Sequence, residues 1–178
     1  MVKNISFLIL LFASLTSQAK FLVGVSSYSW QEVLPVTYTD QTSGLQVNDA
    51  RLATFSTLGL NIGYERLLAP RWLGSTEIVY QTGTVDFQTL SAYASPRKYT
   101  QTIFLNSKLN YRISKVFSIG PELWLNYNNI QTLGSGLNFS GLFNLDYNIL
   151  YDTKIVQTFG TTGGSGTLSY SIGLYQEL

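Results

Sequence analysis

Side chains that could do chemistry are few in this chain, and the usual catalytic ones are absent. Its 178 residues include ten acids and eleven bases, but no histidine and no cysteine. General acid–base catalysis relies most often on histidine, and nucleophilic catalysis needs a nucleophile beside a base. A serine–lysine dyad that uses Lys108 or Lys154 is the arrangement left, and nothing in the sequence marks its serine. We therefore expect no enzyme activity and no catalytic, metal-binding or cofactor-binding residues.

The charged residues lie inside segments in which apolar and polar residues alternate. Apolar residues hold one parity and small, polar or charged residues the other, most clearly over 52–65, 103–113, 117–127, 137–147 and 168–178. Successive side chains of a β-strand point to opposite faces, so each segment is expected to be a strand with one apolar face. Weaker alternation begins at Phe21 and recurs over 72–81 and 151–159, which brings the predicted strands to eight.

The connections between these segments alternate between short and long. The short ones lie near 67–71, 114–115 and 148–150, and the longer ones near 31–50, 82–98, 128–136 and 160–166. An even number of strands returns both termini to one end, and short turns opposite longer loops are typical of transmembrane barrels. Charged residues make up 12% of the chain, about half the ~25% of soluble domains. Much of the surface is therefore expected to face something other than water.

The N-terminus has the features of an export signal. Lys3 supplies a positive charge, the apolar run ISFLILLFASL follows, and the tripeptide ending at Ala19 has the small-x-small pattern that signal peptidase recognises. The run is shorter than the ~20 residues that a spanning helix needs. We expect residues 1–19 to be a signal peptide cleaved after Ala19, and residues 20–178 to be one barrel domain. A retained N-terminal anchor is the alternative.

With these strands and turns the chain resembles the small eight-stranded outer-membrane β-barrels of the OmpA and OmpX type. The last strand matches their assembly signal in its alternation and at Gly173, but departs from it at Gln176 and at Leu178, where phenylalanine is usual. The resemblance implies an all-β, eight-stranded antiparallel up-and-down transmembrane β-barrel. It also implies a monomer in the outer membrane of a Gram-negative bacterium, in contact with lipid, lipopolysaccharide and the barrel assembly machinery.

Two other folds share parts of the pattern. A soluble barrel such as a lipocalin also alternates, but with its apolar face inward, whereas the polar parity here is mostly Asn, Ser and Gly. A secreted amyloid-forming subunit should show an internal repeat, and the sequence has none. A nucleic-acid partner is not expected, because the formal net charge is only +1.

If the apolar parity faces lipid, several charged side chains point into the barrel. We expect two acids and two bases near mid-height to form an ion-pair cluster that plugs it, namely Glu77, Lys108, Glu122 and Lys154. A gated conduit lined by the same residues is the alternative. A lower layer is expected nearer the turns, formed by Glu65, Arg112, Asp146, Asp152 and Glu177. This layer could be solvated, paired with basic residues of the turns, or a weak cation site.

The loops 31–50 and 82–98 are the most distinctive external segments. The first carries β-branched and aromatic residues on both sides of a turn-like stretch, so its strands could continue as a hairpin beyond the membrane. Its exposed edge could add a strand of a partner. Arg97 and Lys98 in the second loop could contact lipid phosphates, and the simpler reading is that both loops only cover the barrel mouth.

The sequence thus predicts a small outer-membrane barrel with a side-chain-filled interior and a structural or loop-presenting, adhesion-like surface role. The OmpX-type resemblance implies the same surface role. A narrow, porin-like channel for small solutes, similar to the OmpW type, is the alternative. Pro121 cannot donate a hydrogen bond within the sheet, so we also expect a β-bulge there.

Overall fold

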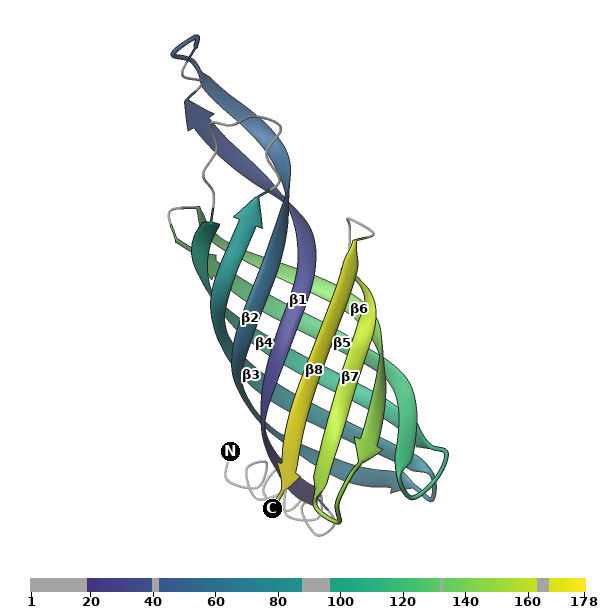
Figure 1. The fold of residues 1–178 in the computed structure, drawn as a ribbon. Helices are drawn as coiled ribbons and strands as arrows, with labels where there is room; N and C mark the ends of the chain where they lie inside the picture. Colours follow the sequence, from purple (N-terminus) through teal and green to yellow (C-terminus); the bar gives the residue numbers. More distant parts are fainter. Residues whose placement is uncertain (1–18, 40–41, 88–96, 132, 163–166) are drawn as a thin grey trace, which may run out of the picture.

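Eight antiparallel strands form a closed barrel in the computed structural model, which describes residues 19–39, 42–87, 97–131, 133–162 and 167–178 (Figure 1). The strands are β1 (Ala19–Thr39), β2 (Gln46–Ala69), β3 (Trp72–Phe87), β4 (Arg97–Arg112), β5 (Phe117–Ile130), β6 (Gly134–Asn148), β7 (Thr153–Thr162) and β8 (Leu168–Glu177). Each strand pairs with the next, and β8 pairs with β1. The predicted fold class is confirmed. The predicted signal peptide lies outside the described residues except for Ala19, which opens β1.

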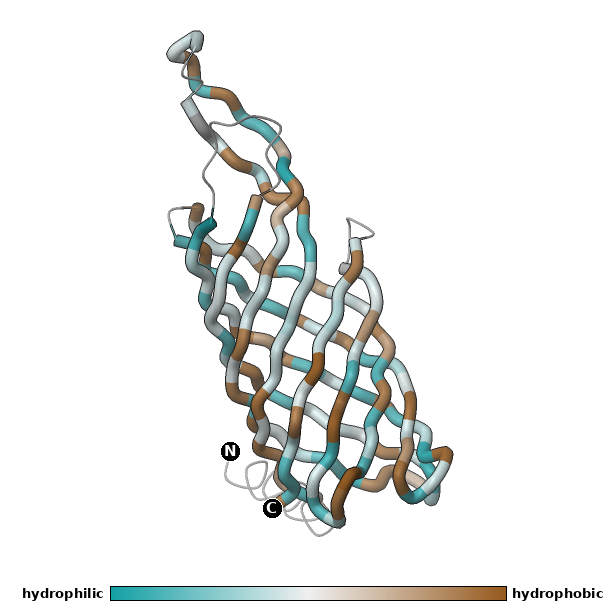
Figure 2. Tube along the Cα trace, in the orientation of Figure 1, coloured by the Kyte–Doolittle hydropathy of each residue, from teal (hydrophilic) through white to brown (hydrophobic). Residues whose placement is uncertain are grey.

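The alternation in sequence becomes an apolar outside and a mixed inside. On β2, Leu58, Leu60 and Ile62 point outward and are more than 60% exposed, whereas Thr57 and Asn61 on the other parity are buried. Figure 2 shows hydrophobic and hydrophilic positions alternating along the strands around the barrel wall. No helix among the described residues is long and apolar enough to cross a bilayer.

The two ends of the barrel differ. The start of β1 at Ala19, the C-terminus and the three short connections lie at one end, here called the turn end, and the opposite ends of the strands define the loop end (Figure 1). Aromatic side chains pair on the outer surface near the turn end. Trp72 packs edge-on against Tyr111 with ring centroids 5.2 Å apart, and Phe117 lies 4.9 Å from Tyr147. Such girdles are typical of the level where a barrel meets the membrane interface.

The β1–β2 hairpin projects beyond the barrel at the loop end (Figure 1). Pairing between β1 and β8 ends at Trp30 with Ser169, and pairing between β2 and β3 ends at Ala53 with Phe87. The β1–β2 ladder nevertheless continues without a register shift to the outer end of β1. Residues 33–39 and 46–52 thus form a two-stranded ribbon about 23 Å long, at ~3.3 Å per residue. The expected hairpin within 31–50 is confirmed.

The bulge expected at Pro121 is wrong. The β4–β5 register is the same on both sides of this residue, and only two pairs of the ladder are missing. A Cβ atom on the preceding Gly120 would lie 2.0 Å from the Leu109 carbonyl oxygen. The glycine therefore lets the two backbones approach closely beside the proline, so the strand passes the missing donor without an extra residue.

Candidate functional site

Five aromatic side chains fill the barrel interior on the loop side of its middle. We call this set the aromatic plug; it comprises Tyr28 and Trp30 of β1, Phe55 of β2, Phe104 of β4 and Trp124 of β5, all at most 2% exposed. Trp30 stacks on Phe55 with ring centroids 4.4 Å apart, and Phe104 packs edge-on against Trp30 and Trp124. Because four strands contribute, the plug extends across the lumen.

A buried cluster of charges lies next to the aromatic plug, toward the turn end. The Lys108 ammonium is 2.7 Å from Glu77 Oε1 and 4.0 Å from Glu122 Oε1. Glu77 also accepts a 2.9 Å hydrogen bond from the Tyr175 hydroxyl, and Glu122 accepts one of 2.7 Å from Trp124 Nε1. One base thus serves two acids, and neutral donors satisfy the remaining carboxylate oxygens, as burial of charge requires.

Lys154 belongs to a different cluster from the one predicted. Its ammonium lies 2.6 Å from Glu65 Oε2 and 3.7 Å from Asp146 Oδ2, one layer nearer the turn end. The prediction placed it at mid-height by counting from Tyr151, but β7 begins at Thr153. Lys154 pairs with Asn148, the last residue of β6, so the late start of the strand lowers it.

The other residues of the predicted lower layer take three positions. Glu65 and Asp146 are the buried partners of Lys154. Glu177 forms an ion pair with Lys20 at the turn-end mouth, and Arg112 lines the same opening. Asp152 was predicted to point inward, which is wrong: it is exposed and precedes β7, outside the sheet. No group of acidic side chains in the described part of the chain is arranged to hold a metal ion.

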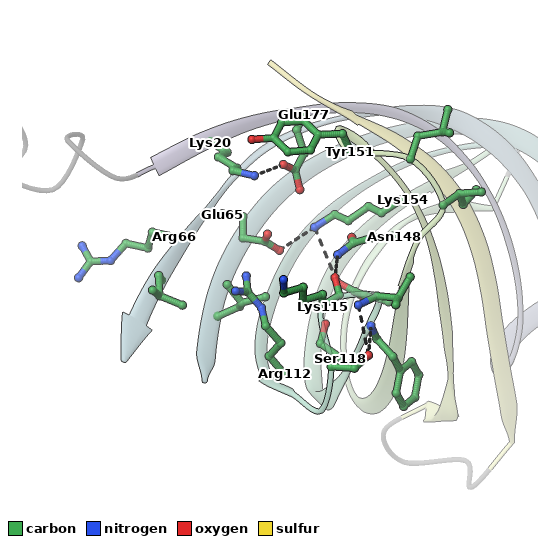
Figure 3. A pocket seen from close by; sticks show the side chains of 18 residues that line it. Lys20, Glu65, Arg66, Arg112, Lys115, Ser118, Asn148, Tyr151, Lys154 and Glu177 are labelled. Atoms are coloured by element: carbon green, nitrogen blue, oxygen red, sulfur yellow. Dashed lines mark hydrogen bonds and ion pairs between the residues drawn. The ribbon is translucent and has the colours of Figure 1, made fainter. Parts of the chain in front are cut away.

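A cavity of about 860 Å³ opens at the turn end of the barrel. We call it the basin. Five bases and three acids line it, together with Ser118, Asn148 and apolar side chains of the turns (Figure 3). The Lys154 cluster forms part of its lining, so the basin is closed on that side by buried ion pairs. The lumen is therefore open at one end and filled beyond.

The sequence analysis placed Glu32 in the external loop 31–50, yet it is a buried carboxylate at the loop end of the interior. Its Oε1 accepts a 2.8 Å hydrogen bond from Trp30 Nε1, and its Oε2 accepts one of 2.7 Å from Asn138 Nδ2. Longer hydrogen bonds come from Asn126 and Asn128. One carboxylate on β1 therefore ties together β5 and β6 where the barrel ends.

Arg97 and Lys98 do not form a single anion site. They are successive residues of β4, so their side chains point to opposite faces of the strand. Arg97 lies outside and donates 2.9 and 3.4 Å hydrogen bonds to the two carboxylate oxygens of Asp86. The phosphate contact expected for both residues is thus limited by geometry to Arg97, whose charge already has a partner.

Sequence reasoning missed the aromatic plug and Glu32, although a signal existed for both. The inward parity of the first strand runs through Tyr28 and Trp30 and continues directly to Glu32. Phe55 and Phe104 also fall on the inward parity of their strands. Parity alone could not show that these rings share one level, because that depends on how the strands are staggered.

No protein-family model matches the chain, and no curated protein matches it in sequence. Solved structures do match. Ail of Yersinia pestis, crystallised with the heparin analogue sucrose octasulfate, has a TM-score of 0.51 at 10% identity, covering 90% of this chain and 96% of Ail. Neisserial surface protein A gives 0.50 at 10% identity, covering 90% and 99%. The outer membrane protein OprG from Pseudomonas aeruginosa gives 0.51 at 12% identity, covering 90% and 97%.

At such low identity these matches show the fold and nothing finer. The chain has the fold of small transmembrane β-barrels, which confirms the architectural resemblance to outer-membrane proteins. Its interior and its hairpin have to be interpreted from their own residues.

Proposed function

We propose that this protein is a small integral barrel of the bacterial outer membrane that carries no solute and presents its β1–β2 hairpin to a partner outside the cell. In this arrangement the turn end faces the periplasm, the apolar outer belt faces lipid, and the loop end faces outward. The proposal includes no catalysis, because the chain has neither histidine nor cysteine for the chemistry usual in barrel enzymes.

The observation that carries the proposal is the combination of a filled lumen with a projecting ribbon. Aromatic rings and hydrogen-bonded ion pairs occupy the inside, so the barrel is built as a rigid support. The ribbon remains paired after both strands have lost their other neighbours in the barrel. A rigid scaffold that carries an extended surface element is a common way to present a binding site.

At one level of the ribbon, neither edge presents a free backbone N–H. The Phe21 and Gln31 carbonyls accept bonds from the β8 side, so odd-numbered residues of β1 direct their backbone groups to that edge. Pro35 is one of these odd-numbered residues, and because it has no N–H it cannot donate a hydrogen bond at this edge. Ala50 lies directly opposite on β2, and its N–H donates a 2.8 Å hydrogen bond to Asp49 Oδ1.

These features argue against the expectation that a partner adds a strand to the hairpin at this level. Natural edge strands are protected in this way by proline and by charged side chains. We therefore propose binding through the faces and tip of the ribbon, where Val33 and Leu45 are exposed. Among the described residues of the ribbon, the charged side chains Asp49 and Arg51 form an ion pair with each other.

Single-channel recording tests the filled lumen. The refolded chain, shown to be folded by its heat-dependent shift on a gel, is expected to give no conductance in a planar bilayer. A variant with Trp30, Phe104 and Trp124 all replaced by alanine should give discrete openings if it still folds. Reproducible openings of the unaltered chain would reject the plug and favour the narrow-channel alternative.

Cell adhesion tests the hairpin. Cells that display the full chain are compared with cells displaying a chain in which residues 33–52 are replaced by a two-residue Asn-Gly turn, which joins the paired residues Glu32 and Ala53. Surfaces coated with matrix proteins or with heparin serve as targets, because Ail was crystallised with a heparin analogue. We expect adhesion of the full chain only. Equal behaviour of both strains, at equal display, would leave the barrel with a structural role alone.

A further inference from the structure

The basin at the turn end has a surplus of positive charge that the ion pairs do not use. Its three acids are all paired, Glu177 with Lys20, and both Glu65 and Asp146 with Lys154. Three more bases line the cavity without an ion pair to any acid in the described part of the chain, namely Arg66, Arg112 and Lys115. Five bases against three acids leave an excess of two positive charges.

Two of the unpaired bases project from one turn into the cavity. Figure 3 shows Arg112 and Lys115 together beside the Lys154 ion pair, whereas Arg66 points away from the other lining residues. Arg112 ends β4 on its inward parity, and Lys115 belongs to the connection to β5. A guanidinium and an ammonium are therefore presented to the same space at the membrane-proximal mouth of a barrel.

The turn that carries them is held in place by hydrogen bonds. The Arg112 N–H donates to the Arg71 carbonyl at 2.7 Å, and the Val116 and Phe117 N–H groups donate to Ser114 Oγ at 3.2 and 3.1 Å. From β6, Asn148 Nδ2 donates to the Lys115 carbonyl at 3.0 Å. The backbone bearing both cations is thus fixed before any ligand binds, which lowers the entropic cost of binding.

We propose that the basin binds a phosphate-bearing ligand, with the phosphate between Arg112 and Lys115. Guanidinium groups match phosphate oxygens with paired N–H donors, and an ammonium adds a point charge. Arg112 and Lys115, the two bases without an acidic partner that face this space, together carry the two positive charges that one phosphate dianion would balance. The apolar rim, with Ile149, Leu150 and Tyr151 exposed, also suits a phospholipid headgroup, so the phosphate comes from a lipid or from a soluble phosphate ester.

The test uses the refolded full chain in a maltoside detergent, which has no phosphate of its own. Phosphorus NMR follows inorganic phosphate as protein is added, and the same titration is made with Arg112→Gln and Lys115→Gln. Arg71→Gln is the matched control, since Arg71 lies at the same end but outside the basin lining and donates to the Tyr111 hydroxyl at 3.0 Å. That hydrogen bond raises the pKa of Arg71, so both kinds of variant remove one full charge.

We expect saturable phosphate binding that weakens about tenfold or more in each basin variant, as loss of a charge-assisted hydrogen bond implies, and that is unchanged in Arg71→Gln. A second arm reconstitutes the proteins in phosphatidylcholine vesicles with or without phosphatidylglycerol and measures lipid immobilisation at the protein by spin-labelled headgroups. Selectivity for phosphatidylglycerol, lost in the basin variants, assigns the lipid source, and binding of phosphate alone assigns a soluble ligand. Absence of both signals, or equal weakening in Arg71→Gln, overturns the proposal. Channel and adhesion results do not bear on it.

Discussion

Lys108 donates a 2.7 Å hydrogen bond to Glu77 on the neighbouring strand, inside the barrel, and neither side chain is more than 2% exposed. The two residues come from β4 and β3, and Glu122 on β5 approaches the same ammonium at 4.0 Å. In a buried pair of this kind each charge needs the other, because removing one partner leaves the other charge buried without compensation. The stability of the barrel therefore depends on this cluster.

Replacing Lys108 by methionine is expected to destabilise the barrel by about 3–5 kcal/mol, because two buried carboxylates lose their cation. Urea unfolding in detergent, followed by tryptophan fluorescence, measures the change. Adding Glu77→Gln to the same chain should restore part of the loss. Lys98→Met is the control, because Lys98 lies at the loop end and is only half-buried. An unfolding midpoint of Lys108→Met equal to that of the unaltered chain would contradict the role of the cluster.

Replacing Lys154 by methionine tests the second cluster separately. Glu65 and Asp146 would lose their shared cation, so we expect a loss of similar sign, about 3 kcal/mol or more. The effects of Lys108→Met and Lys154→Met should be nearly additive if the two clusters are independent. Strong non-additivity in the double variant would show that the two clusters are coupled.

Replacing Phe104 by alanine removes the ring that contacts both tryptophans of the aromatic plug. We expect a loss of about 3–5 kcal/mol from lost burial and the cavity left behind. Phe139→Ala is the matched control, because Phe139 lies on the outer face of β6 and is 57% exposed. The same unfolding assay compares them, and equal losses at the two positions would argue against a packed plug.

Removing the carboxylate of Glu32 leaves its hydrogen-bond donors from β5 and β6 without an acceptor. We expect Glu32→Ala to destabilise the loop end by about 2–3 kcal/mol. Hydrogen exchange at amides of β5 and β6 near Asn126 and Asn138 should rise before exchange at the turn end does. Asp86→Ala, which removes an exposed carboxylate, should leave these amides unchanged. Unchanged protection in Glu32→Ala would mean that the Glu32 carboxylate is not needed to hold β5 and β6 together there.

Opening both edges of the ribbon should make the protein associate. Pro35→Val restores an N–H on one edge, and Asp49→Ala frees the Ala50 N–H on the other. We expect the double variant to form dimers or larger species by light scattering in detergent, while the unaltered chain stays monomeric. Thr37→Val controls for the added valine, because it changes no backbone donor. A monomeric double variant would show that something else protects these edges.

The predicted maturation site is tested at the N-terminus of the exported protein. Mass spectrometry of the protein from the outer membrane should find Lys20 as its first residue. This would leave intact the ion pair of Lys20 with Glu177 and would remove only the Ala19–Arg66 pair from the β1–β2 ladder. A first residue at Met1 would instead support a retained anchor.

The sequence by itself determined the fold class and the side of the wall on which each strand residue lies. Alternation is a local property of the extended chain, so the inward position of Glu77, Lys108, Glu122 and Trp124 could be read from parity. The continuation of strands 1 and 2 into a hairpin was readable for the same reason, since β-branched residues extend past the last barrel pair.

The tertiary structure alone decided which inward residues meet. The height of a side chain depends on the stagger of all eight strands and on where each begins, and neither is encoded in any one segment. For this reason the sequence could not show that Lys154 pairs with Glu65 and Asp146 or that Asp152 lies outside the interior. It also could not show that rings from four strands lie at one level and form a plug. The closure of the ribbon edges was also invisible in sequence, because it requires Pro35 and Ala50 to be paired across two strands.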